Sequence, residues 1–111
     1  MHSKTMKIKE RKKEIAKLFA KELFLANPRD ISSIFLFGSV LQGRPDRESD
    51  IDLMIFAKHP KEVSNKTKEL AFDFLLKRNE VIEPQVYSVK DYQNPSSYFV
   101  WQVLKKGKKI F

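Results

Sequence analysis

The chain contains no cysteine, and this absence excludes several kinds of functional site. Without thiols it forms no disulfide, no thiolate zinc site and no cysteine nucleophile, and this composition suits the reducing cytoplasm. Histidine is nearly absent too, since His2 and His59 are too few for a centre built mainly on imidazole. No apolar run approaches the roughly eighteen residues of a membrane span, and no signal-peptide core follows the basic N-terminus. We therefore expect a cytoplasmic protein with no part in the membrane.

The remaining composition is that of a small, basic, globular chain. Its 111 residues are 41% apolar, which predicts a single domain over residues 1–111. The net charge of +8 would attract phosphate-bearing partners such as nucleotides and nucleic acids. The lysines are nevertheless spread over two predicted helices and the tail, so a solvated basic surface is the simpler explanation of the charge.

Apolar residues at helical spacing predict three helices. They run from about Ser3 to Leu25, from His59-Pro60 to about Arg78, and from Tyr98 to Leu104. The apolar stripe of the first helix consists of Ile15, Leu18, Phe19 and Leu23. The solvated remainder of this helix carries Lys12, Lys13, Lys17 and Lys21. In the third helix we expect Tyr98, Phe99 and Trp101 to pack in the core.

Three strands are predicted between and after these helices, over Ile31 to Phe37, Asp50 to Phe56 and Val81 to Ser88. Gly38-Ser39 ends the first strand, and the polar segment 43–49 reads as an exposed loop. The short tail after Gly107 can add a fourth strand. This order of elements predicts a compact α/β or α+β domain with helices packed on one small sheet.

Two aspartates lie at the start of the second predicted strand. Because side chains alternate along a strand, Asp50 and Asp52 share one face, roughly 7 Å apart, while Ile51 and Leu53 suit the core. Two carboxylates held together repel each other unless a cation lies between them. Oxygen ligands of this kind favour Mg²⁺ or Mn²⁺. A solvent-facing acidic strand end is the simplest alternative for an isolated Asp-x-Asp.

The turn after the first strand favours a metal site over a solvent-facing acidic strand end. Gly38 allows a phosphate to approach the backbone closely, and the Ser39 hydroxyl with nearby amides can hold anionic oxygens. If the two strands pair, this turn faces the carboxylates across one edge of the sheet. The sequence then predicts a phosphate-binding turn opposite a metal-binding pair.

These residues resemble a known signature. Gly38-Ser39, ten intervening residues and then Asp50-Ile51-Asp52-Leu53 resemble the motif of the polymerase-β-type nucleotidyltransferase superfamily, in particular its small members called minimal nucleotidyltransferases. The resemblance extends over most of the chain. It implies a mixed sheet of about four strands flanked by helices. It also implies a third carboxylate on a later strand, at the position of Glu83.

The resemblance further implies an activity. Members transfer a nucleoside monophosphate, here expected to be AMP from ATP, to a protein or RNA acceptor by a two-metal mechanism. Asp50, Asp52 and Glu83 would bind Mg²⁺ or Mn²⁺ and support catalysis, and Gly38 and Ser39 would bind the nucleotide. Minimal members are often the antitoxin of a small helical HEPN-type protein, so such a partner is expected. A homo-oligomer could equally complete the site of so short a chain.

Several alternatives stay open at this stage. Glu83 stands where relatives commonly have aspartate, and the following Pro84 indicates an edge or irregular strand, so Glu83 can also be an ordinary exposed residue. In that case the chain is a binding module that neutralises a partner protein by contact alone. A basic RNA- or DNA-binding protein is the third hypothesis. Arg44 and Arg47 could contact a triphosphate, although a solvated loop explains them as well, and His59 is expected to cap a helix or lie exposed.

Overall fold

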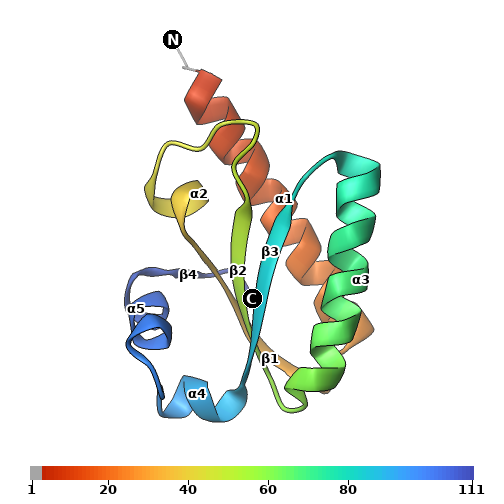
Figure 1. Ribbon diagram of the computed structural model, residues 1–111, viewed down its shortest axis with the longest axis vertical. Coiled ribbons are helices and arrows are strands. Elements are labelled where there is room, and N and C mark those ends of the chain that lie inside the picture. Colours follow the sequence, from red (N-terminus) through yellow and green to blue (C-terminus); the bar gives the residue numbers. More distant parts are fainter. Residues whose placement is uncertain (1–3) are drawn as a thin grey trace.

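A four-stranded sheet lies at the centre of the molecule, with helices on both faces (Figure 1). The computed structural model describes the backbone of residues 4–111 and the side chains of residues 7–111. In chain order the elements are α1 (Lys4–Ala26), β1 (Ile31–Phe37), α2 (Ser39–Gln42), β2 (Ile51–Ala57), α3 (Pro60–Arg78), β3 (Ile82–Ser88), α4 (Val89–Gln93), α5 (Tyr98–Lys106) and β4 (Lys108–Lys109). None of the described helices is both long enough and apolar enough to cross a lipid bilayer.

The strands are ordered β3-β2-β1-β4 across the sheet. Strand β1 is antiparallel to both β2 and β4, whereas β2 and β3 are parallel and are joined by helix α3. The predicted mixed sheet of about four strands is thus confirmed, including the strand in the tail. Pro84 lies in β3, which is an edge strand. Proline has no backbone N–H, and on the outer side of an edge strand no neighbouring strand needs one as a hydrogen-bond donor.

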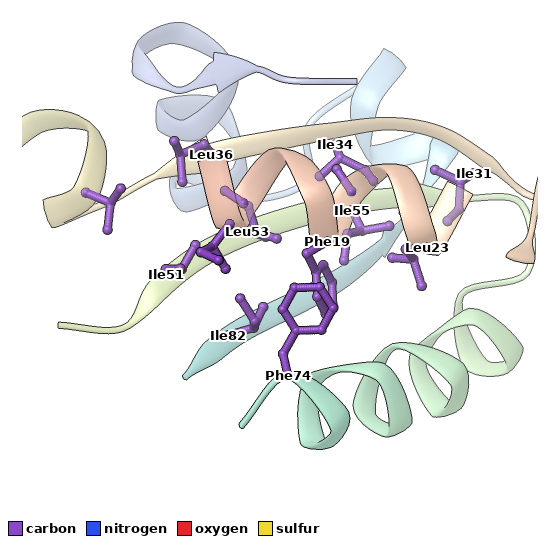
Figure 2. Close-up of a cluster of buried hydrophobic side chains, with 14 of the residues drawn as sticks. Phe19, Leu23, Ile31, Ile34, Leu36, Ile51, Leu53, Ile55, Phe74 and Ile82 are labelled. Atoms are coloured by element: carbon purple, nitrogen blue, oxygen red, sulfur yellow. The ribbon is translucent and has the colours of Figure 1, made fainter. Parts of the chain in front are cut away.

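Two apolar cores follow from the central position of β2, which is buried on both faces. On one face, residues of β1 and β2 that alternate along each strand pack against α1 and α3, with Phe19 and Phe74 in edge-to-face contact at 5.1 Å (Figure 2). On the other face, Met54 and Phe56 pack against Val100 and Val103 of α5. The alternation therefore assigns each side chain of β2 to one core or the other.

Local sequence signals explain most helix boundaries. Helix α3 has Pro60 in its first turn and is capped after Arg78 by Asn79, which adopts the left-handed conformation at φ 54°. Helix α5 begins where the Ser97 side chain accepts a hydrogen bond from the amide of Val100. The five-residue helix α4 was not predicted. Its start is marked by the Ser88 side chain, which accepts a hydrogen bond from the Lys90 amide. So short a helix has no apolar periodicity from which it could be predicted.

Four details of the sequence prediction need correction or qualification. Strand β2 begins at Ile51, so Asp50 precedes the strand rather than opening it. The predicted helix start at Ser3 lies outside the described residues. Tyr98, Phe99 and Trp101 are not core residues, because they are 70%, 39% and 44% exposed. Tyr98 stacks on Trp101, while the valines of α5 face the sheet.

The burial of Lys12 is the fourth correction. The sequence places this lysine on the solvated side of the first helix, yet it is only 2% exposed. A helix that crosses the end of a sheet can bury a residue outside its apolar stripe when the neighbouring loops close over it. Here the segments before β2 and β3 close over Lys12 and bind its ammonium group.

Candidate active site

The turn after β1 and the first residues of β2 meet in close contact. Phe37, the last residue of β1, pairs with Asp52 of β2, so the following Gly38 lies beside the Asp52 side chain. Gly38 has φ 79° and ψ −158°, a combination open almost only to glycine. A Cβ atom on Gly38 would come within 2.2 Å of Asp52 Oδ2. The glycine is therefore required both for the backbone turn and for the position of the carboxylate.

Strand pairing brings the third predicted carboxylate to the same place. Asp52 of β2 is in register with Glu83 of β3 in a parallel pair. Paired residues of neighbouring strands project from the same face of a sheet, and this is the face that α5 covers. Asp50 immediately precedes β2. The fold thus gathers the three predicted carboxylates at one end of the sheet, beside the Gly38 turn.

The charges of these groups act on one another. Burial raises the pKa of Asp52 above its usual value, and the negative charges of Asp50 and Glu83 raise that pKa further. Among the described residues no lysine or arginine forms an ion pair with any of the three. Within residues 7–111, the negative charges of this cluster therefore have no ion-pair partner.

The residues fit a divalent metal site. Three carboxylates provide the hard oxygen ligands that Mg²⁺ and Mn²⁺ take. The glycine at position 38 leaves room for Asp52, which any larger residue would displace. The mutual repulsion of the carboxylates is relieved when a cation binds between them. Asp50 and Glu83 are exposed, so solvent and ligands reach the cluster.

A tighter group of possible metal ligands lies at the opposite end of the sheet. Oxygen and nitrogen atoms of Asp30, His59 and Glu62 come within 4.8 Å of one another, the only such trio among residues 7–111. His59 Nδ1 is 2.6 Å from Asp30 Oδ1 and makes no capping bond to helix α3, so His59 is exposed as expected but does not cap. Asp30 precedes β1 and His59 follows β2. This trio is therefore remote from the carboxylates beside Gly38, and it was not recognised from the sequence because its members are 29 and 3 residues apart.

The other predicted ligand residues are also exposed. Ser39 opens helix α2 directly after Gly38, and its side chain is exposed to solvent. Arg44 is exposed in the loop before β2. Arg47 instead lines a cavity of about 350 Å³ between α1 and the end of α3, together with Arg11, Lys12 and Arg78. Arg47 therefore lies on the α1 side of the sheet, away from the face that carries Asp52.

Comparisons with known proteins identify the family of the chain. The model of the family described as polymerase beta, nucleotidyltransferase, matches residues 7–111 of the chain. A candidate protein adenylyltransferase of Methanocaldococcus jannaschii is 33% identical over 76 residues, which cover 67% of this chain and 77% of that protein.

Solved structures show the same fold. A chain of a toxin–antitoxin structure with AMP-PNP is 26% identical, with a TM-score of 0.58 over 86% of this chain and 72% of that chain. A chain of a mutant MntA–HpeT toxin–antitoxin complex gives a TM-score of 0.58 at 23% identity and the same coverage. A candidate nucleotidyltransferase from Sulfolobus solfataricus gives 0.57 at 20% identity, over 84% of this chain and 81% of that one.

Proposed function

The chain belongs to the polymerase beta nucleotidyltransferase family, and from this premise we propose that it transfers AMP from ATP to a hydroxyl group of a protein acceptor. The family membership makes it a nucleotidyltransferase. The nucleotide, the acceptor and the roles of individual residues are the proposal. The observation that carries it is the cluster of Asp50, Asp52 and Glu83 beside the Gly38 turn.

Each residue of the cluster has a part in this proposal. Asp50, Asp52 and Glu83 would hold Mg²⁺ or Mn²⁺, which neutralises charge on a triphosphate and on the departing pyrophosphate. Gly38 keeps the backbone close to Asp52, and the exposed Ser39 hydroxyl can donate to a phosphate oxygen. The Leu41 and Gln42 amides of α2 already donate to the Gly38 carbonyl oxygen, which leaves the Ser39 and Val40 amides as the candidate backbone donors to a phosphate.

The reaction is a displacement at the α-phosphorus of ATP. The acceptor oxygen forms a new bond to that phosphorus, the bond to the bridging oxygen breaks, and pyrophosphate leaves. The acceptor proton passes to solvent or to an exposed carboxylate such as Glu83. No protein nucleophile is needed, so the protein's contribution is alignment and charge placement.

The choice of ATP and of a protein acceptor rests on the relatives. The Methanocaldococcus jannaschii relative is named as a protein adenylyltransferase, and one similar solved structure is a toxin–antitoxin structure with AMP-PNP. We propose by the same reasoning that the chain acts on a small helical HEPN-type toxin, as its antitoxin. An RNA acceptor is the other outcome that the test must distinguish.

Radiolabelled ATP provides the test. The protein is incubated with α-³²P-ATP and Mg²⁺, with the protein encoded beside it or with total RNA, and the label is followed into each fraction. The proposal expects label in the protein fraction, abolished by Asp50→Asn together with Asp52→Asn. Label in RNA would replace the protein acceptor by an RNA acceptor. Absence of both transfer and ATP binding would overturn the proposal.

One observation favours a second candidate function. The three carboxylates do not come as close together as Asp30, His59 and Glu62, which are the only three such side chains among residues 7–111 whose ligand atoms all lie within 4.8 Å of one another. A chain whose cluster stays open would bind a partner without transferring a nucleotide. Partner neutralisation that survives Asp50→Asn with Asp52→Asn would favour this binding module, whereas its loss in a folded variant would favour transfer.

A further inference from the structure

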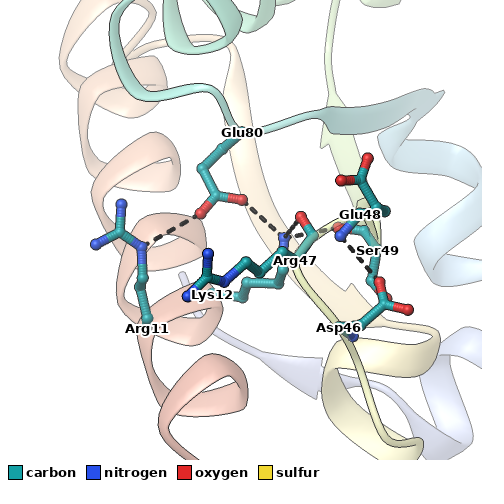
Figure 3. Close-up of polar contacts among 7 residues, drawn as sticks. All are labelled: Arg11, Lys12, Asp46, Arg47, Glu48, Ser49 and Glu80. Carbon is teal, nitrogen blue, oxygen red and sulfur yellow. Dashed lines mark hydrogen bonds and ion pairs between the residues drawn. The ribbon is translucent and has the colours of Figure 1, made fainter. Parts of the chain in front are cut away.

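Lys12 is a buried cation that lies outside the carboxylate cluster and bonds to both segments leading into it (Figure 3). Its Nζ atom donates to the Ser49 carbonyl oxygen at 2.8 Å, to Glu80 Oε1 at 2.8 Å and to the Arg47 carbonyl oxygen at 3.3 Å. An ammonium group has three protons to donate. The bonding capacity of Lys12 is therefore filled entirely by these three acceptors.

The acceptors lie one to three residues before the candidate metal ligands Asp50 and Glu83. Ser49 is joined by its carbonyl group to Asp50, and Glu80 lies three residues before Glu83. The two segments are also bonded to each other, because the Ile51 amide donates to the Val81 carbonyl oxygen at 2.9 Å. One side chain of helix α1 thus fixes the entry to β2 and the entry to β3 at the same point.

The partners of Lys12 are themselves held in place. The Glu80 side chain is only 7% exposed, and its second oxygen lies 3.5 Å from Arg11 Nε. The loop before Ser49 is ordered by a local turn in which Asp46 Oδ1 accepts from the Glu48 amide and from the Ser49 hydroxyl. A well-ordered loop on one side and a buried carboxylate on the other make Lys12 a rigid link.

Stability alone does not account for such a pair. Buried ion pairs contribute little net stability compared with apolar residues of the same volume, because both charges lose their hydration. In some proteins a buried pair instead fixes one geometry, since each charge must meet its partner. The geometry that Lys12 defines is the relative position of the segments that carry Asp50 and Glu83.

We propose that Lys12, paired with Glu80, is a positioning residue for nucleotide transfer and sets the separation of Asp50 and Glu83 in the metal-binding cluster. This inference rests on the proposed function, because it assigns the cluster to metal binding. Lys12 does not touch the nucleotide or the metal in this proposal. It acts through the Ser49 carbonyl group and the Glu80 carboxylate.

The test uses Lys12→Met, which keeps an unbranched side chain, shorter by one atom, and removes the charged ammonium group. Lys9→Met is the matched control, because Lys9 lies three residues earlier on α1 and donates to the same loop at the Gly43 carbonyl oxygen, 3.2 Å away. Mn²⁺ affinity is measured by titration calorimetry in the absence of nucleotide. We expect Lys12→Met to weaken Mn²⁺ binding at least 10-fold and Lys9→Met to change it less than 2-fold.

A second variant separates positioning from simple stabilisation. Lys12→Met with Glu80→Met removes both buried charges, so the melting temperature is expected to recover towards that of the unmodified protein. Mn²⁺ affinity should stay weak, because the Ser49 carbonyl oxygen still lacks its hydrogen bond from residue 12. Recovery of affinity together with melting temperature would overturn the proposal, as would an unchanged affinity in folded Lys12→Met.

Amide hydrogen exchange gives a readout that needs no metal. The proposal expects faster exchange of the Ile51 amide in both Lys12 variants, by at least 10-fold relative to the amides at the centre of β2. Unchanged exchange at Ile51 would overturn the positioning role even if the protein bound no metal. Failure of the unmodified protein to bind Mn²⁺ and to transfer label, with the exchange result as expected, would instead overturn the proposed function.

Discussion

Replacing Gly38 by alanine is the most direct perturbation of the candidate site. The added Cβ atom would lie 2.2 Å from Asp52 Oδ2 and 3.0 Å from Asp52 Cγ, whereas ordinary van der Waals contacts begin at 3.4 Å. The Asp52 carboxylate would therefore have to move by about 1 Å, and a displacement of this size at a reacting centre can cost roughly 100-fold in rate. Gly38→Ala should thus lower transfer and Mn²⁺ affinity together.

The same substitution also strains the backbone. At φ 79° and ψ −158° a residue with a Cβ atom costs about 1–3 kcal/mol. Unfolding entropy for a chain of this length converts each kcal/mol into a shift of about 4 °C in melting temperature. We therefore expect Gly38→Ala to lower the melting temperature by about 4–12 °C.

Gly43→Ala is the matched control, one residue beyond the short helix α2. Gly43 has φ −115°, which any residue adopts, and its added Cβ atom would lie 3.1 Å from Ser39 Cα. Its effect on the free energy of unfolding should stay within about 1 kcal/mol of zero, with Mn²⁺ affinity unchanged. Thermal unfolding and calorimetry measure both quantities. A Gly38→Ala protein as stable as the Gly43→Ala protein, with normal Mn²⁺ affinity, would refute the assigned contact.

Three further predictions concern other parts of the molecule. The hydrogen bond to Asp30 raises the pKa of His59 above its usual value of about 6.5. The pair therefore stabilises the fold fully below about pH 6.5 and loses its effect as the pH rises through the raised pKa of His59. NMR titration should show a lower pKa of His59 in Asp30→Asn. In EDTA, which removes any bound metal, Asp52→Asn should raise the melting temperature at neutral pH, because burial, Asp50 and Glu83 all disfavour the Asp52 charge. A lower melting temperature would contradict this. Without EDTA, the same variant should lose Mn²⁺ binding. Phe19→Ala should cost about 3–5 kcal/mol in urea unfolding because Phe19 is fully buried, whereas Phe72→Ala, at a site 60% exposed, should stay within about 0.5 kcal/mol.

Much of the fold was predictable because the determining signals are local. The helices α1, α3 and α5 and the strands β1 to β3 each carry an apolar pattern of their own, and their observed limits lie within two residues of the predicted ones. Helix α4 was missed because it has only five residues and no apolar face of its own. Tyr98 and Trp101 were assigned to the core because aromatic side chains are usually buried, but Val100 and Val103 occupy the face of α5 that meets the sheet.

The candidate site was predictable where its residues lie in one short segment, and not where separate strands bring them together. The two-residue spacing of Asp50 and Asp52 indicated a carboxylate pair, although Asp50 lies just before β2 and only Asp52 is in the strand. The abrupt end of a buried strand indicated Gly38. The placement of Glu83 beside Asp52 depends on a parallel pairing that no local pattern specifies. The Asp30, His59 and Glu62 trio likewise joins separate elements and has no sequence motif.

The sequence by itself determined which residues can carry the chemistry, because carboxylate spacing, glycine and apolar periodicity are properties of short segments. Only the tertiary structure decided how those segments meet. It placed Gly38 against the Asp52 carboxylate, brought Glu83 into register with Asp52, and buried Lys12 between the entries to β2 and β3. The physical reason is that burial and charge pairing depend on atoms far apart in the chain, and their positions are fixed only when the sheet and helices pack together.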